Sequence, residues 1–203
     1  DEELKSFRQV SFDDYRQRLK PKRDGPALAV VVAEGEIGDG EAPPGRIGGL
    51  STAALIRKAR EDDQVKALVL RVDSPGGSAF GAELIRRELE LTRAAGKPVV
   101  VSMGDVAASG GYWISMNADR IYADPSTITG SIGIFGLFPT IDRGLGKIGV
   151  RTDGVGTAKY AGAFDITRPL DPGVATTVQS VIEKGYRDFT GKVAQARGRS
   201  VQQ

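Results

Sequence analysis

The 203-residue sequence contains neither cysteine nor histidine. Without cysteine the chain can form no disulfide and no thiolate metal site, and without histidine it lacks the commonest remaining ligand for transition metals. We therefore expect no metal site and no cofactor. The same absences constrain any catalysis by serine, because no histidine can take its proton and no cysteine can replace it. A base of another kind, most simply a lysine held neutral by burial, is then required.

Long apolar runs are also absent, since no stretch approaches the roughly 18 residues that span a bilayer. The N-terminus, Asp1-Glu2-Glu3, is acidic and is followed by no apolar segment typical of signal peptides. Lys and Arg (28) and Asp and Glu (26) are interspersed without a basic block, which argues against nucleic acid as a partner. We expect a soluble chain, either a mature form or an excised fragment, because it stops soon after a long predicted helix.

The chain divides into an arm and one domain. Residues 1–26 are polar and charged with weakly periodic apolar residues, so we interpret them as a helical arm and linker. Residues 27–203 suffice for a single α/β domain. Short apolar runs rich in β-branched residues predict strands at 27–33, 66–72, 98–102 and 120–123. The first run is continuously apolar, which is typical of a strand buried on both faces.

Helical segments separate these strands, an alternation that favours a right-handed parallel sheet flanked by helices. We expect one helix capped by Ser51 or Thr52, a second over 79–95 that ends at Gly96, and a third from Ser109 to about residue 117. Further along we expect a glycine-punctuated strand or loop at 131–136, a helix at 141–148, a strand at 150–155 and a long helix from 171 to 197.

Ser109 is the first candidate for chemistry, because function in parallel sheets gathers at the carboxyl ends of the strands. It lies at a strand-to-helix junction and is followed by Gly110 and Gly111. Its hydroxyl is then exposed beside the free N–H groups of a helix N-terminus, which suits a nucleophile and its oxyanion hole. The alternative is that Ser109 only caps the helix, while the glycines allow close packing against the sheet.

Residues 73–77 (DSPGG) form a second glycine turn, at the end of an adjacent predicted strand. Backbone N–H groups of such a turn could bind a peptide carbonyl or complete an oxyanion hole. Pro-Gly is also common in ordinary tight turns. Two glycine turns at neighbouring strand ends favour the functional interpretation.

The candidate base is a lysine. The pKa of lysine, ordinarily about 10.4, must fall by about 3 units for it to act near neutral pH, so it needs apolar cover. Lys159 is the one lysine with small and aromatic neighbours, within residues 156–162 (GTAKYAG). The alternative is a solvated surface charge, which is where most lysines lie.

Four short segments stand out along the chain: residues 72–78 (VDSPGGS), 96–104 (GKPVVVSMG), 107–114 (AASGGYWI) and 129–133 (TGSIG). They occur in the order seen in the signal peptide peptidase A family of Ser/Lys-dyad serine proteases, and the sequence resembles that family over essentially its whole length. This family shares its fold with ClpP and the crotonases. The resemblance therefore implies an α/β, ClpP/crotonase-like fold with a mostly parallel sheet flanked by helices.

The resemblance also implies roles for individual residues. The chain looks most like the C-terminal half of the family's long form, in which the other half supplies the lysine; in the short form a neighbouring subunit supplies it. The base is therefore Lys159, which falls near the family's lysine position, or a lysine from another half or subunit. The other implied positions are Ser109 as nucleophile, Gly77 and Gly110 as oxyanion-hole donors, Ser131 as the residue that positions the lysine, and Gly76 and Asp73 as substrate-binding residues.

The resemblance implies a serine endopeptidase that hydrolyses hydrophobic peptides such as cleaved signal peptides, bound by strand addition. It also implies a homo-oligomer at the periplasmic face of the bacterial inner membrane, anchored through a segment outside this chain. Two alternatives stay open. One is a noncatalytic half that scaffolds the oligomer and binds peptide. The other is an acyl-CoA enzyme of the crotonase type, which would not need Ser109 and usually has a carboxylate in its pocket.

Overall fold

The computed structural model describes residues 10–18 and 25–202. Its strands are β1 (Ala27–Glu34), β2 (Ile37–Gly38), β3 (Ile47–Gly48), β4 (Val65–Ser74), β5 (Val99–Ala108), β6 (Arg120–Tyr122) and β7 (Ile128–Gly130). Its helices are α1 (Phe12–Arg18), α2 (Gly49–Glu61), α3 (Ala79–Ala94), α4 (Gly110–Ser115), α5 (Asp142–Lys147) and α6 (Pro172–Arg197). The main sheet is parallel with the order β1-β4-β5-β6, and β7 is added beside β5. The predicted α/β fold with a mostly parallel sheet flanked by helices is confirmed.

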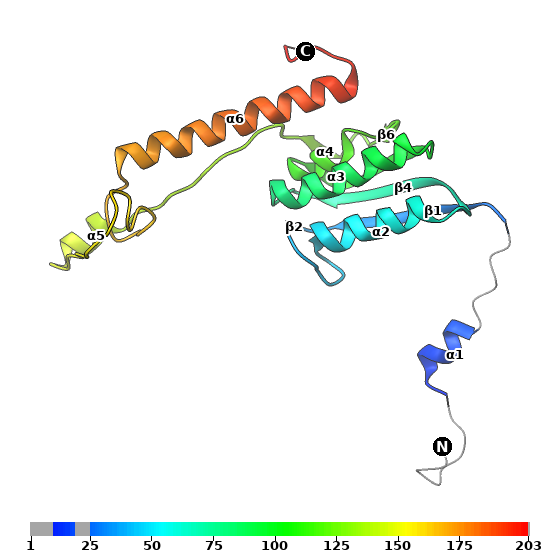
Figure 1. Ribbon diagram of the computed structural model, residues 1–203, viewed down its shortest axis with the longest axis horizontal. Helices are drawn as coiled ribbons and strands as arrows, with labels where there is room; N and C mark the ends of the chain where they lie inside the picture. Colours follow the sequence, from blue (N-terminus) through cyan, green and yellow to red (C-terminus); the bar gives the residue numbers. More distant parts are fainter. Residues whose placement is uncertain (1–9, 19–24, 203) are drawn as a thin grey trace, which may run out of the picture.

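Helices α2, α3 and α4 lie on one face of this sheet (Figure 1). Strands β4 and β5 send alternate side chains to that face, where Leu70 and Val101 are fully buried. The two strands pair from Leu68 and Val99 to Ser74 and Ala107, with a register shift between Val72 and Ser74. Because parallel strands end at the same edge, the segments that follow β4 and β5 are placed side by side.

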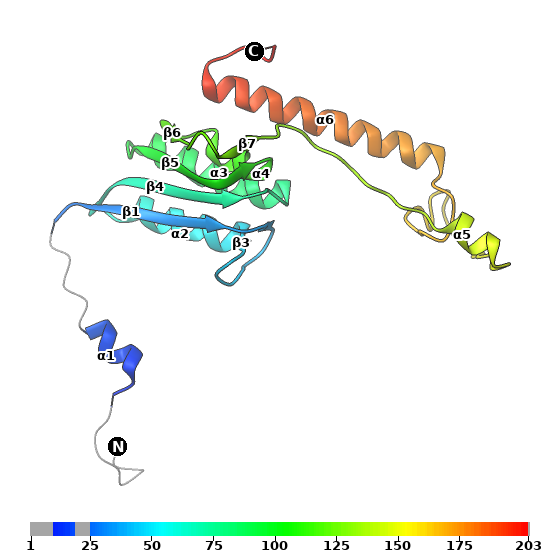
Figure 2. The ribbon, with the colours of Figure 1, turned by 180° about the vertical axis from the view of Figure 1, so that it is seen from behind.

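Strand β1 departs from its prediction. Val31 and Ala33 are buried toward the helices, whereas Leu28, Val30 and Val32 are 64%, 64% and 60% exposed. The prediction of burial on both faces is therefore wrong. β1 is an edge strand, and Figure 2 shows no described helix over the sheet face opposite α2 and α3. A continuous apolar run predicts the strand but not whether both faces of its sheet are covered.

Helix α2 starts at Gly49 with Gly48 as its N-cap, so the predicted cap at Ser51 or Thr52 is wrong. The backbone is too crowded at the cap for a side chain, because a Cβ on Gly48 would lie 2.4 Å from the Gly40 carbonyl oxygen. Ser51 instead lies in the first turn, where its hydroxyl donates to the Gly48 carbonyl at 3.3 Å.

Residues 131–170 leave the sheet as an outlying segment, and α6 leads the chain back to it (Figure 1). Helix α5 confirms the helix predicted at 141–148. The strand predicted at 150–155 is wrong, since no described strand lies there. Its apolar residues have no neighbouring strand with which to form a ladder, and Val155 is fully exposed.

Helix α6 confirms the long helix. Asp171 caps its N-terminus by accepting hydrogen bonds from the N–H groups of Gly173 at 2.7 Å and Val174 at 3.2 Å. Its C-terminal half packs on α4 through Phe189, whose ring centroid lies 4.6 Å from that of Trp113. Among the described residues, no helix is both long and apolar enough to cross a bilayer.

Candidate active site

Ser109 joins β5 to α4 in a backbone conformation that L-residues rarely adopt. Its φ is 52° and its ψ −116°, a strain of about 1–3 kcal/mol in general terms. Two hydrogen bonds hold this geometry: the Ser109 N–H donates to the Gly130 carbonyl at 3.0 Å, and the Ser109 carbonyl accepts from the Trp113 N–H at 2.9 Å. Ser109 is the N-cap residue of α4, but within the described residues its hydroxyl makes no capping bond to that helix.

The two glycines after Ser109 let α4 approach the end of β4. A Cβ on Gly111 would lie 2.6 Å from the Ser74 carbonyl oxygen, and a Cβ on Gly110 would lie 3.1 Å from the Cα of Gly76. The turn after β4 and the junction after β5 are therefore in direct contact. The two glycine turns meet at one edge of the sheet, as the sequence predicts.

The turn after β4 directs a second N–H toward this edge. Gly76 and Gly77 have φ values of 106° and 141°. Gly77 forms a parallel bridge with Ile37, in which the Ile37 N–H donates to the Gly76 carbonyl and the Ser78 N–H donates to the Ile37 carbonyl. These bonds use the groups that flank Gly77, so its own N–H faces away from β2. Neither this N–H nor that of Gly110 donates to another group in the described part of the chain.

Two adjoining hollows open at Ser109. The inner cavity, of about 130 Å³, is lined by Gly77, Ala79, Ala82, Ser109, Gly110, Trp113, Gly133, Ile134, Phe135 and Phe189. The outer groove, of about 730 Å³, is lined by Glu36, Pro75, Gly76, Gly77, Ser109, Ser131, Gly133, Ile134 and Phe135. Ser109 and Gly77 thus line both the outer groove and the inner cavity.

The groove also contains Ser131 and a carboxylate that the sequence analysis did not single out. Ser131 has a positive φ of 49° and lies on the groove with Ser109. Among the residues that the structure describes, Glu36 is the only one with an ionisable side chain that lines either hollow. It is 68% exposed and 4.0 Å from a guanidinium nitrogen of Arg46. No lysine of the described chain lines the groove or the cavity.

Two predicted site residues lie elsewhere. Lys159 belongs to the outlying segment, where it is exposed and its Nζ lies 5.1 Å from the centre of the Tyr160 ring. Figure 1 places the chain around residue 160 at the end of α6 remote from the sheet, so the structure does not bring Lys159 to Ser109 within one chain. The Asp73 carboxylate accepts a hydrogen bond from the Val106 N–H at 3.1 Å and lines neither hollow.

The family model described as Peptidase family S49 matches residues 92–203, which is more than half of the chain. The chain belongs to peptidase family S49. The matched region includes Ser109, Gly110, Ser131 and Lys159, whereas the Gly76-Gly77 turn precedes it.

Similar proteins agree with membership in S49. "Protease 4" of Salmonella typhi is 52% identical over 198 residues, which is 98% of this chain and 32% of that protein. "Protease 4" of Haemophilus influenzae is 48% identical over 93% of this chain and 31% of its own length. "Serine protease SPPA, chloroplastic" of Arabidopsis thaliana is 38% identical over 86% of this chain and 26% of its own length. The resemblance to the signal peptide peptidase A family is confirmed, and the chain spans about a third of the length of the two bacterial relatives.

Among solved structures, a mutant of ClpP1 from Listeria monocytogenes matches this S49 chain with a TM-score of 0.50 at 14% identity. The match covers 86% of this chain and 75% of the ClpP1 chain. At this identity it bears on the fold alone, and it confirms the predicted ClpP-like architecture.

The sequence analysis missed the aromatic wall of the inner cavity. Trp113 and Phe189 are 8% and 2% exposed, and both line the cavity of this S49 domain. Trp113 stands within the quoted segment 107–114, but nothing in that segment shows which way its ring points. Phe189 is one of several apolar residues spaced along α6, and its role depends on where α6 packs.

Proposed function

We propose that this domain carries the nucleophilic serine of a serine endopeptidase, with Ser109 as the nucleophile. The observation that carries the proposal is the junction at Ser109. Its positive φ presents the side chain between the inner cavity and the outer groove, beside N–H groups of Gly77 and Gly110 that have no partner among the described residues. Membership in peptidase family S49 supports the same reaction class.

In the proposed reaction, the Ser109 Oγ attacks a peptide carbonyl while a neutral lysine amine takes its proton. The carbonyl oxygen becomes an oxyanion, which accepts hydrogen bonds from the N–H groups of Gly77 and Gly110. As the C–N bond breaks, the lysine ammonium returns the proton to the departing amine. Water then attacks the acyl-enzyme through the same base, which releases the second product and restores the serine.

We propose that this lysine comes from another half or another copy of the parent protein rather than from the same chain. No described lysine lines the groove or the cavity, and Lys159 is exposed in the outlying segment. The groove beside Ser131 has room for an incoming side chain, and the Ser131 hydroxyl would accept a hydrogen bond from its ammonium. This arrangement leaves Ser109 without its base in an isolated copy.

The inner cavity points to hydrophobic peptide substrates. The cavity is lined by Gly77, Ser109 and Gly110, the residues that would surround the attacked carbonyl. It would therefore receive the side chain of the substrate residue that supplies this carbonyl. Its volume of about 130 Å³ is close to that of an apolar cavity of about 150 Å³ that holds one benzene. An aliphatic side chain of leucine size fits. Cleaved signal peptides, extended along the groove by strand addition, have this character.

The proposal includes a homo-oligomer at the periplasmic face of the bacterial inner membrane, anchored by a segment outside this chain. Phe135 and Leu137 in the outlying segment are 89% and 80% exposed. Large exposed apolar side chains gathered on one segment are typical of surfaces that another protein covers. A neighbouring copy seated there would cover them.

The decisive experiment is Ser109→Ala in the longest protein that contains this domain, assayed with a fluorogenic hydrophobic peptide. Loss of a nucleophile that acts as a unit with its base lowers kcat by about 10⁶. We expect hydrolysis to disappear while the far-UV circular dichroism spectrum is unchanged.

Ser102→Ala is the matched control, because Ser102 lies on the same strand and its hydroxyl accepts a hydrogen bond from Arg71 at 3.0 Å. Its activity should be that of the native protein. Undiminished hydrolysis by the Ser109→Ala protein would refute the proposed nucleophile.

A further inference from the structure

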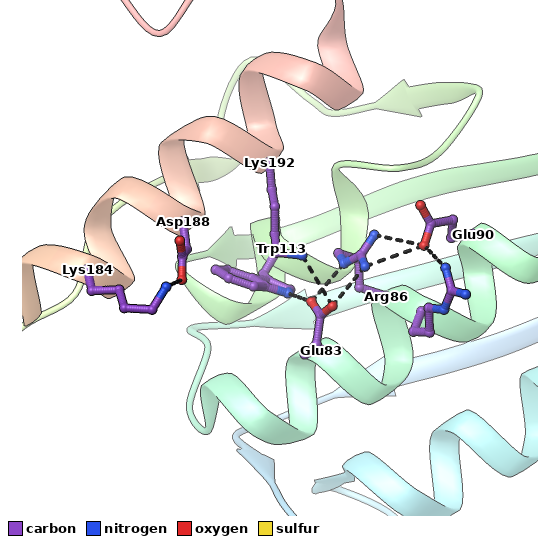
Figure 3. A network of polar contacts seen from close by, with 8 residues as sticks. Glu83, Arg86, Glu90, Trp113, Lys184, Asp188 and Lys192 are labelled. Carbon is purple, nitrogen blue, oxygen red and sulfur yellow. Dashed lines mark hydrogen bonds and ion pairs between the residues drawn. The ribbon is translucent and has the colours of Figure 1, made fainter. Parts of the chain in front are cut away.

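A carboxylate lies directly behind the inner cavity. Glu83 of α3 accepts hydrogen bonds from Trp113 Nε1 at 2.8 Å, from Arg86 at 2.7 and 2.8 Å, and from Lys192 Nζ at 3.4 Å. Figure 3 shows these donors converging on Glu83 from α3, α4 and α6. One side chain thus connects the three helices that surround the cavity.

Trp113 is the cavity residue that this carboxylate holds. Its indole lines the inner cavity and packs against Phe189, with an angle of 53° between the two rings. An indole has a single N–H donor. Trp113 is 8% exposed, and loss of the bond to Glu83 would remove the one partner that its N–H has among the described residues, which is costly. The hydrogen bond to Glu83 therefore selects one position for the cavity wall.

The charge of Glu83 persists despite its partial burial. Burial disfavours the ionised form, but hydrogen bonds from Arg86 and Trp113 and the charges of Arg86 and Lys192 outweigh it and lower the pKa of Glu83 to about 2. Arg86 alone contacts both carboxylate oxygens. The bonds from Trp113 and Lys192 help to keep Glu83 ionised, and they also tie it to α4 and α6.

Lys192 links Glu83 to α6, which forms the opposite wall of the cavity. It lies one helical turn after Phe189 on α6. The same helix packs against the start of the outlying segment, where a Cβ on Gly185 would lie 2.5 Å from the Cδ1 of Ile134. Ile134 lines the inner cavity. Glu83 thus holds one wall directly, through Trp113, and the other through Lys192 and α6.

We infer that Glu83 is a positioning residue that decides which substrate side chains the inner cavity accepts. The inference rests on the proposed peptidase function. With the indole held against Phe189, the cavity of about 130 Å³ keeps one shape, which accepts an aliphatic side chain more readily than the flat ring of a benzyl group. Release of the indole lets this wall move and weakens that discrimination. Glu83 itself touches no substrate and acts through Trp113 and Lys192.

The test compares Glu83→Gln with the native sequence in the longest active protein. The substrates are two fluorogenic peptides that differ only in having leucine or phenylalanine before the scissile bond. We expect the ratio of kcat/KM for leucine over phenylalanine to fall about tenfold, the effect of a small change in an apolar pocket. The change should lie in KM rather than in kcat, because the reacting groups are untouched.

Glu90→Gln is the matched control. Glu90 lies on the same helix and also accepts from Arg86, at 3.5 Å, and from Arg87, but these two partners line neither hollow. Its leucine preference should equal that of the native protein. On α6, Lys192→Met should lower the preference, whereas Lys184→Met removes only an exposed ion pair with Asp188 at 3.0 Å (Figure 3) and should not.

The melting temperature of every variant separates positioning from general stability. A lower Tm for Glu83→Gln with an unchanged leucine preference would overturn the inference. If this variant does not fold, Trp113→Phe keeps a ring and deletes the N–H donor. It should lose the leucine preference in the same way, and an unchanged preference would again overturn the inference.

A binding measurement separates this inference from the proposed function. Trp113 is the only tryptophan in the chain. The protein used is the 203-residue chain carrying Ser109→Ala. The fluorescence of Trp113 should report the binding of acetyl-Ala-Ala-Leu-amide and of the same peptide with phenylalanine in place of leucine. Adding Glu83→Gln should lower the affinity for the leucine peptide relative to that for the phenylalanine peptide. This readout needs no hydrolysis, so it tests Glu83 even if Ser109 is not the nucleophile. Equal discrimination with and without Glu83 would refute the inference alone.

Discussion

At the residue scale, backbone strain is concentrated at the groove. Ser109 and Ser131 are the only non-glycine residues with positive φ in the described part of the chain, and both line the groove. The register of β7 against β5 explains their proximity, because Ala108 pairs with Gly130 and each serine follows directly. Strained residues of this kind persist where the surrounding structure holds them, and they cluster at functional sites. The glycines after Ser109 predict its exposure, whereas the position of Ser131 depends on this pairing.

Gly110→Ala tests the oxyanion hole at this scale. A Cβ there would lie 3.2 Å from Ile37 Cδ1 and 3.3 Å from the Gly77 nitrogen, so the two N–H groups must separate slightly. Loss of one oxyanion donor lowers kcat by about 10²–10³. We expect a decrease of this size in kcat with little change in KM, measured by steady-state hydrolysis of a hydrophobic peptide.

Gly191→Ala supplies the comparison. Gly191 lies within α6, and a Cβ there meets nothing within 4 Å. This variant should keep full activity and gain about 0.5–1 kcal/mol in the free energy of unfolding, because alanine favours the helix. An unchanged kcat in Gly110→Ala would argue against its N–H as an oxyanion donor.

At the scale of elements, the sequence predicts what depends on local pattern. The four main strands and helices α3, α5 and α6 follow from apolar runs and breakers, and the two glycine turns meet because parallel strands end at one edge. The exposed face of β1, the Gly48 cap and the missing strand at 150–155 depend on neighbours that a local pattern does not contain. The same holds for the site: Ser109 and Gly77 are local motifs, whereas Trp113 and Phe189 meet through helix packing.

The N-cap of α6 gives a prediction about one element. The Asp171 carboxylate satisfies the N–H groups of Gly173 and Val174. Asp171→Ala should destabilise the helix by about 1 kcal/mol. Native-state hydrogen exchange should show faster exchange of the first-turn amides, and circular dichroism should show a lower melting temperature for the helical signal.

Glu183→Ala is the control on the same helix. Glu183 is exposed and accepts a hydrogen bond only from Gln179 among the described residues, at 3.1 Å. Its removal should change stability by less than about 0.5 kcal/mol. Equal effects of the two substitutions would mean that the cap does not stabilise α6.

At the scale of the whole molecule, the described part of one chain places no lysine beside the proposed nucleophile. The sheet supplies Ser109 and the two N–H groups, and the start of the outlying segment supplies Ile134 and Phe135 to the cavity. The rest of that segment, with Lys159, extends away along α6 (Figure 1). The groove has space beside Ser131 but no lysine from the described chain. Under the proposed mechanism, the base enters from outside the copy that holds the serine.

Lys159→Ala in the longest protein that contains the domain tests where that base originates. Lys159 is exposed and lines neither hollow, so we expect hydrolysis of a hydrophobic peptide to stay at the native level. The control is Lys147→Ala, on α5 in the same segment, which should also keep native activity. The base is then a lysine other than Lys159, from another half or another copy. A loss as complete as that of Ser109→Ala would instead assign the base to Lys159 of a neighbouring copy. In that case a mixture of the Ser109→Ala and Lys159→Ala proteins would regain activity, because sites form between the intact serine of one copy and the intact lysine of the other.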